Sequence, residues 1–199
     1  ARFRSYSTNR FAAAHNQLIR QLKGAHQQVT HNLFGGFFNV AHEQNEFAEM
    51  LDFVSYDNYP VWGELKAPIP PAQIAMTLDY IRGLKQRNFW IVEQLMGAQG
   101  HNHIGYLPRP NQAKLWAYQA MARGCENMLF FRWRGATRGA EQFCLGIIDA
   151  HNQNGRKFIE AQAFINDIAQ YETALQQPIS AEVAILYDFD NIKSWQIQQ

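Results

Sequence analysis

A glutamate that follows a run of large apolar residues is the first candidate for a catalytic group in this chain. Residues 89–92 are all apolar and of strand length, and Glu93 comes directly after them. In (β/α) barrels the carboxyl ends of the parallel strands form the rim that carries the catalytic groups. A carboxylate at that rim can attack a substrate or exchange protons with it. We therefore treat Glu93 as the candidate catalytic residue.

Two further strand-like runs, residues 53–56 and 128–131, also end in polar or aromatic residues. The predicted rim then contains Asn32, Asp57, Asn58, Tyr59, Glu93, Arg132, Trp133, Arg134 and, in a following loop, Glu141. Aromatic rings stack on sugar faces, while carboxylates, amides and guanidinium groups hydrogen-bond pairs of hydroxyls. The residue types therefore favour a site for a neutral, polyhydroxylated ligand.

Glu93 also has a purely structural interpretation, which the residues alone leave open. A buried glutamate is often only the partner of an arginine, and Arg132 or Arg134 could fill that role. His101 and His103 have the spacing of metal ligands, but no third ligand converges on them in the sequence. We expect neither a metal nor a cofactor.

Helical and strand-like patterns alternate along the chain. Apolar residues at helical spacing predict a first helix that Ser7 or Thr8 caps, and a short strand at 29–34 then ends at Gly35 and Gly36. Further helices precede the strands at 53, 89 and 128, and a last amphipathic helix starts at Arg156. This order predicts an α/β fold with four parallel strands, half of a (β/α)8 TIM barrel. After Pro178, residues 182–187 are expected to form the first strand of a second α/β domain.

Five short segments carry a resemblance to a known family. They are residues 54–60, 92–94, 109–120, 130–134 and 139–142. Taken in register, they resemble the second half of the β-galactosidases of glycoside hydrolase family 42. The resemblance implies a TIM-barrel catalytic domain over residues 1–177 and, over 178–199, the start of a domain through which such enzymes form trimers. It also implies retaining hydrolysis of terminal β-D-galactosides.

The resemblance assigns roles to individual residues. Glu93 matches the family's nucleophile, Glu141 matches a glutamate that binds galactose hydroxyls, and Asn58 and Tyr59 match the motif beside the nucleophile. Arg132 belongs to the same substrate-binding set. Two positions depart from the family pattern: His101 stands where a Trp is usual, and Cys144 lies in the stretch that replaces an expected sugar-binding His. The galactose subsite is thus altered on two sides.

The general acid/base is the missing part of the predicted site. In the family it follows an Asn at the end of the fourth barrel strand, and the only Asn-Glu pair here, Asn45-Glu46, falls within a predicted helix. We expect that residue, and the first four strands, to lie upstream of this chain. The competing interpretation is a noncatalytic carbohydrate-binding or assembly fragment.

Composition excludes several other classes. With 199 residues, 47% hydrophobic content and a net charge of +1, the chain is globular and has no basic stripe for nucleic acid or an anionic membrane. No apolar run approaches the length of a membrane span. The two cysteines, Cys125 and Cys144, have neither a disulfide pattern nor zinc spacing, so we expect a cytoplasmic protein.

Overall fold

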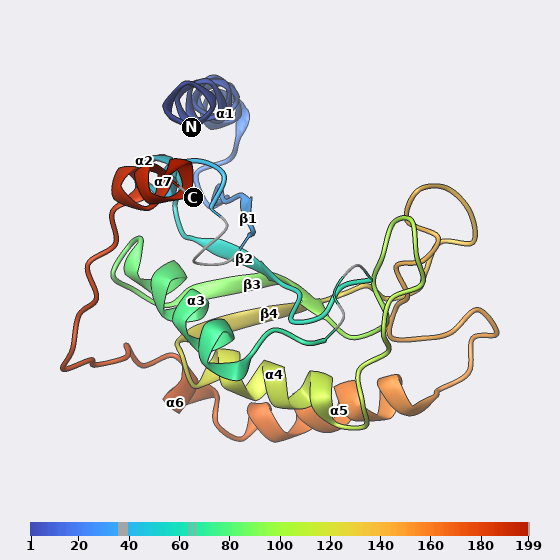
Figure 1. The fold of residues 1–199 in the computed structure, drawn as a ribbon. Helices are drawn as coiled ribbons and strands as arrows, with labels where there is room; N and C mark the ends of the chain where they lie inside the picture. Colours follow the sequence, from blue (N-terminus) through green and yellow to red (C-terminus); the bar gives the residue numbers. More distant parts are fainter. Residues whose placement is uncertain (36–39, 64, 66, 199) are drawn as a thin grey trace.

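A parallel sheet with helical crossovers forms the body of the molecule. The computed structural model describes residues 1–35, 40–63, 65 and 67–198. Four strands follow one another in the order β1-β2-β3-β4, and each is parallel to its neighbour (Figure 1). They are β1 (Asn32–Leu33), β2 (Ser55–Asn58), β3 (Phe89–Leu95) and β4 (Cys125–Phe131). The alternation predicted from the sequence is confirmed. The predicted strand stop at Gly36 lies outside the described residues.

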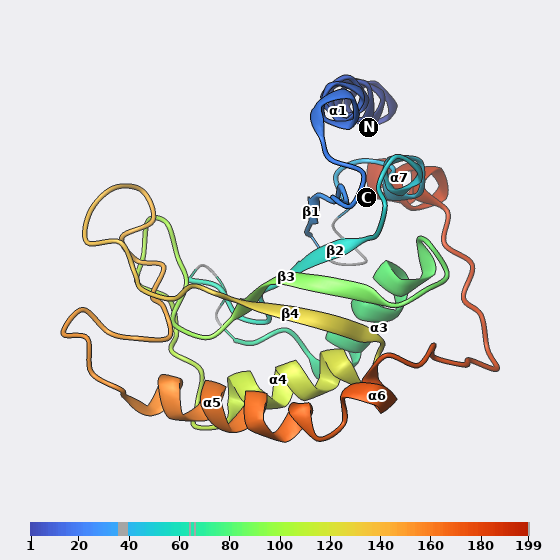
Figure 2. The same ribbon diagram turned by 180° about the vertical axis from the view of Figure 1, so that it is seen from behind.

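Helices separate the strands, as parallel pairing requires. They are α2 (Gln44–Glu49), α3 (Pro71–Gly83), α4 (Gln112–Met121) and, after β4, α5 (Arg156–Ala169). Both ribbon views show α3, α4 and α5 covering the same side of the sheet (Figures 1 and 2). Because the four strands are parallel, their carboxyl ends, which carry the polar residues, meet at one edge of the sheet.

The hydrophobic core lies between the sheet and these helices. Leu78 and Ile81 of α3, Phe89 and Ile91 of β3 and Ala117 of α4 are all at most 1% exposed. Full burial of a large apolar side chain stabilises a fold by about 1.5–3 kcal/mol. This packing fixes the position of β3 and thus that of Glu93, which follows the apolar residues 89–92.

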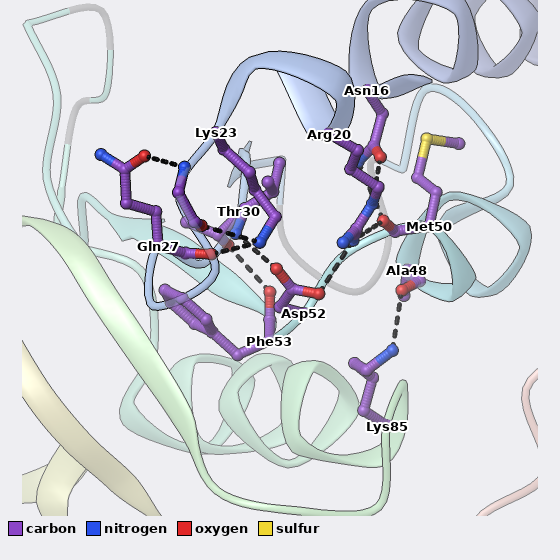
Figure 3. Close-up of polar contacts among 12 residues, drawn as sticks. Asn16, Arg20, Lys23, Gln27, Thr30, Ala48, Met50, Asp52, Phe53 and Lys85 are labelled. Carbon is purple, nitrogen blue, oxygen red and sulfur yellow. Dashed lines mark hydrogen bonds and ion pairs between the residues drawn. The ribbon is translucent and has the colours of Figure 1, made fainter. Parts of the chain in front are cut away.

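The first helix, α1 (Arg2–Leu22), attaches to the body through polar groups. Its buried residues are Ser5, Asn9 and Asn16, and Arg20 donates to the Met50 carbonyl and to Asp52 (Figure 3). The predicted cap at Ser7 or Thr8 is wrong, because the helix begins at Arg2. Its large apolar residues are exposed instead of buried; they are Phe3, Tyr6, Phe11, Leu18, Ile19 and Leu22.

Side-chain hydroxyls and a carboxylate hold the short strand β1 against β2. Thr30 Oγ1 donates to the Phe53 carbonyl at 2.8 Å, as Figure 3 shows, and Ser55 Oγ donates to the His31 carbonyl at 2.9 Å. The Val29 amide donates to Asp52 Oδ2 at 2.7 Å. These contacts extend an attachment that has only two ladder positions, Asn32 with Ser55 and Leu33 with Tyr56.

The C-terminal region differs from the expectation. After α6 (Glu172–Leu175), residues 182–187 form no strand; residues 182–186 are exposed, Tyr187 packs against Tyr80, and the chain continues into α7 (Phe189–Ile197). The β-branched and apolar residues of this segment favour a strand, but a strand also needs a neighbouring backbone, and none among the described residues pairs with it. An ion pair between Arg2 and Asp190 joins α7 to α1. None of the helices in the described part of the chain has both the length and the apolar character needed to cross a membrane.

Candidate active site

A cleft of about 530 Å³ opens at the carboxyl ends of β2, β3 and β4. Six of the seven predicted site residues line it: Asn58, Tyr59, Glu93, His101, Glu141 and Cys144. They come from segments far apart in the sequence, and parallel strand order brings them to one edge. The seventh, Arg132, contacts the cleft through Glu141.

Glu93 has a hydrogen-bond donor on each carboxylate oxygen. Asn32 Nδ2 donates to Oε1 at 3.0 Å, and the Tyr59 hydroxyl donates to Oε2 at 2.5 Å. Burial, followed by this hydrogen bond and the nearby charge of Glu93, raises the pKa of the Tyr59 phenol above its ordinary value. Tyr59 therefore stays protonated and remains a donor. Together the two donors fix the orientation of the carboxylate.

The contacts do not support the interpretation of Glu93 as the ion-pair partner of an arginine. Arg132 donates to Glu141 Oε2 at 2.9 Å, and Arg134 donates to the Ala150 carbonyl at 3.2 Å. Neither guanidinium is an ion-pair partner of Glu93 among the described residues. The carboxylate is thus held by neutral donors, which leave its charge uncompensated.

A β-bulge sets the position of Glu93. Tyr56 of β2 pairs with Ile91 of β3, but the next residue, Asp57, pairs with Glu93, so Val92 is the extra residue. Bulges re-aim side chains, and they occur often beside active sites. Here the bulge brings two carboxyl groups opposite one another on neighbouring strands.

Asp57 shares the donor that serves Glu93. Asn32 Nδ2 lies 3.1 Å from Asp57 Oδ1 and 3.3 Å from Oδ2. Burial, and then the charge of Glu93, raise the pKa of Asp57 to about 7, although the Asn32 hydrogen bond opposes that shift. Asp57 therefore keeps its proton to a higher pH than an ordinary aspartate does.

Aromatic side chains form one wall of the cleft. The Tyr59 ring lies 5.3 Å from the Trp62 ring and 6.1 Å from the Phe131 ring, and Trp62 lies 5.1 Å from His101. All of these contacts are edge-on. Such a wall offers ring faces to the apolar side of a sugar.

Asn58 and Cys144 are buried beneath the cleft. Asn58 Nδ2 donates to Gln94 Oε1 at 2.8 Å, which ties the end of β2 to that of β3. The Cys144 thiol donates to the Gly100 carbonyl at 3.5 Å. Burial is the main cause that raises the pKa of this thiol, and the charge of Glu141 acts in the same direction. Cys144 is therefore a weak nucleophile.

Close contact between two loops places Cys144 and His101. The Leu145 amide donates to the Ala98 carbonyl at 2.8 Å. A Cβ atom at Gly97 would lie 2.4 Å from the Leu145 carbonyl oxygen, so the backbone needs glycine there. Among the described residues, no cluster of three or more His, Cys, Asp or Glu side chains could hold a metal ion.

Two predicted rim residues, Trp133 and Arg134, lie away from the cleft, and its lining includes aromatic residues that were not predicted. Trp133 is 61% exposed and packs against Phe158, and Arg134 binds the Ala150 carbonyl. Trp62 and Phe131 were not singled out from the sequence, although both lie within or directly after strand-end motifs. Their position near the ends of predicted strands was the feature of the sequence that could have identified them.

The parallel sheet, and the cleft with an oriented carboxylate at the carboxyl ends of its strands, are features of part of a (β/α) barrel. A family model described as β-galactosidase, that of glycoside hydrolase family 42, matches residues 1–171. This chain therefore belongs to the family 42 β-galactosidases, and the predicted resemblance is confirmed.

Individual relatives agree with the family match. A β-galactosidase of Clostridium cellulovorans is 36% identical over 99% of this chain and 30% of its own length. Among solved structures, the β-galactosidase of Rahnella sp. R3 has a TM-score of 0.83 at 25% identity, over 98% of this chain and 29% of its own. That of Bacillus circulans sp. alkalophilus has a TM-score of 0.79 at 29% identity, over 95% and 27%. The chain thus spans less than a third of the length of these relatives.

Proposed function

We propose that this chain is the nucleophile-bearing part of a retaining β-galactosidase, with Glu93 as the nucleophile. The observation that carries the proposal is the pair of donors, Asn32 and Tyr59, that orient both oxygens of one strand-end carboxylate in an aromatic-walled cleft. Family membership supplies the reaction class.

In the proposed reaction, an oxygen of Glu93 forms a bond to the anomeric carbon while the bond to the leaving oxygen breaks. A second carboxylic acid, about 5–5.5 Å from the nucleophile, protonates the leaving oxygen and then activates water to hydrolyse the glycosyl ester. We infer that this acid/base lies outside the 199 residues. Asp57 is not assigned this role, because the family's acid/base is the glutamate of an Asn-Glu pair, whereas Asp57 follows Tyr56.

The remaining cleft residues would bind the terminal galactose. Glu141, 52% exposed and joined to Arg132, can accept from sugar hydroxyls without reaching the scissile bond. Tyr59 and His101 would contact the sugar from the aromatic wall, and Asn58 and Cys144 would shape the floor.

We further propose the domain division and setting implied by the family. Residues 1–177 would complete a barrel with an upstream half, and residues 178–199 would begin a trimerisation-type domain. Exposed apolar side chains at Val183, Ile185 and Leu186 support a contact with further polypeptide. The free, buried cysteines support a cytoplasmic location.

Covalent trapping tests the central proposal. The full-length protein would be treated with a dinitrophenyl 2-deoxy-2-fluoro-β-galactoside and digested, and the labelled peptide sequenced. We expect label on Glu93, with Glu126→Gln as a matched control that labels normally, since Glu126 lies at the opposite end of β4. Label on another carboxylate would refute the assignment. A protein that binds galactosides but takes no label would favour the noncatalytic carbohydrate-binding interpretation.

A further inference from the structure

Two carboxyl groups in the cleft share one amide donor. Asn32 Nδ2 lies 3.0 Å from Glu93 Oε1 and 3.1 Å from Asp57 Oδ1. A side-chain amide nitrogen carries two hydrogens, so it can serve both carboxyl groups at once. The bridge exists because the bulge in β3 sets Glu93, and not Val92, opposite Asp57.

The two carboxyl groups are not equally supported. Glu93 receives a second hydrogen bond from the Tyr59 hydroxyl, whereas the hydrogen bonds to Asp57 among the described residues come from Asn32 alone. Asp57 takes part in none of the ion pairs found in the described part of the chain. A single negative charge is therefore better placed on Glu93, and a proton on Asp57.

The groups that face Asp57 agree with this division. They are Asn32 from β1, Glu93 from β3 and the Tyr59 phenol from the loop after β2. The raised pKa of Asp57, about 7, has burial as its largest cause and the Glu93 charge as its second. Two titratable groups whose surroundings separate their protonation states in this way divide their roles.

We propose that Asp57 is a positioning residue for Glu93, which it controls through the Asn32 amide that bridges them. While Asp57 is neutral, the amide serves Glu93 and holds it for attack. When Asp57 ionises, the new charge draws the amide toward Asp57, so the hydrogen bond from Asn32 to Glu93 lengthens and weakens. This inference rests on the proposed role of Glu93 as nucleophile.

The test measures the covalent step alone as a function of pH. The full-length protein is inactivated by the dinitrophenyl 2-deoxy-2-fluoro-β-galactoside. An oxygen of Glu93 bonds to the anomeric carbon, and dinitrophenolate leaves with the electron pair. No proton is transferred, so the ionisation of an acid/base elsewhere does not enter. We expect the wild-type inactivation rate to fall roughly tenfold as the pH rises from 6 to 9, the order expected for one lost hydrogen bond to a charged group.

Two variants separate the proposed route from simpler ones. Asp57→Asn keeps the shape and cannot ionise, so its rate should stay level over the same pH range. Asn32→Ala removes the bridge, and its rate should be lower but also level. Glu126→Gln is the control and should keep the wild-type fall, because Glu126 lies at the far end of the strands, where it accepts a hydrogen bond from Trp90.

Each other outcome has a definite meaning. A wild-type rate that does not fall, or an Asp57→Asn rate that falls like wild type, overturns the inference while label on Glu93 leaves the proposed function intact. A fall that persists in Asn32→Ala overturns the route through the amide. Label on a residue other than Glu93 overturns the proposed function and, with it, the inference.

Discussion

Removal of the Tyr59 hydroxyl should weaken catalysis without disturbing the fold. In Tyr59→Phe, the ring keeps its contacts with Trp62 and Phe131 and loses only the hydrogen bond to Glu93 Oε2. That bond is 2.5 Å long, half-buried and made to a carboxylate, which are the features of a strong, charge-assisted hydrogen bond.

The expected loss follows from the energy of such a bond. Hydrogen bonds to charged groups contribute about 1.5–3 kcal/mol, and each ~1.4 kcal/mol in the barrier changes the rate tenfold. Tyr59→Phe should therefore lower kcat/KM of the full-length enzyme by about one to two powers of ten.

The assay is the pH dependence of kcat/KM on a nitrophenyl galactoside. Tyr106→Phe provides the matched control, since Tyr106 is 58% exposed in a loop and should behave like wild type. If Tyr59→Phe stays within about twofold of wild type across the pH range, the hydroxyl does not orient the nucleophile, and the reasoning is refuted.

Three further predictions concern the site and its support. Glu141→Gln should mainly weaken transition-state binding, whereas Glu93→Gly should be inactive until azide restores turnover of a dinitrophenyl galactoside; azide rescue of the Glu141 variant alone would reverse the two assignments. Gly97→Ala should lower the unfolding midpoint, because its Cβ would lie 2.4 Å from the Leu145 carbonyl oxygen. Gly83→Ala, whose Cβ would have no atom within 4 Å, should stabilise α3 by about 0.5–1 kcal/mol. Equal shifts of the midpoint in the two variants would contradict the packing argument. The 199-residue chain alone should associate, because β1 and β4 each pair on one side only within the described residues. It should show no turnover, because the general acid contributes about 10²–10⁴ in rate. A soluble, active monomer in size-exclusion chromatography would disprove the half-barrel assignment.

Local patterns in the sequence were enough to find the main strands and part of the cleft lining. The apolar runs before Asp57, Glu93 and Arg132 became β2, β3 and β4, because a buried parallel strand needs apolar residues on both faces. Strand-end position then singled out Asp57, Asn58, Tyr59 and Glu93, since all parallel strands deliver their carboxyl ends to one edge, whereas His101 and Cys144 came from the family resemblance.

Features that depend on distant partners could not be read in the same way. The bridge from Asn32 to Asp57 and Glu93 requires the register of three strands, including the bulge at Val92. Residues 182–187 have strand-like composition, yet no described strand lies beside them. The polar attachment of α1 was also not predicted, because the helical spacing of its apolar residues indicated that the apolar face, and not the polar face, would be buried.

Strand β1 has two residues, so it can detach from β2 while the rest of the sheet stays folded, and the cleft is then incomplete. Native proteins open locally, and elements with few ladder hydrogen bonds open at lower free energy than core strands. The amide hydrogen of Leu33 should thus exchange with solvent sooner than that of Ile91, which lies in the middle of the sheet. Each opening of β1 withdraws Asn32 from the cleft, so a bound sugar that needs the assembled site should slow hydrogen exchange at β1, many residues away in sequence from the nucleophile.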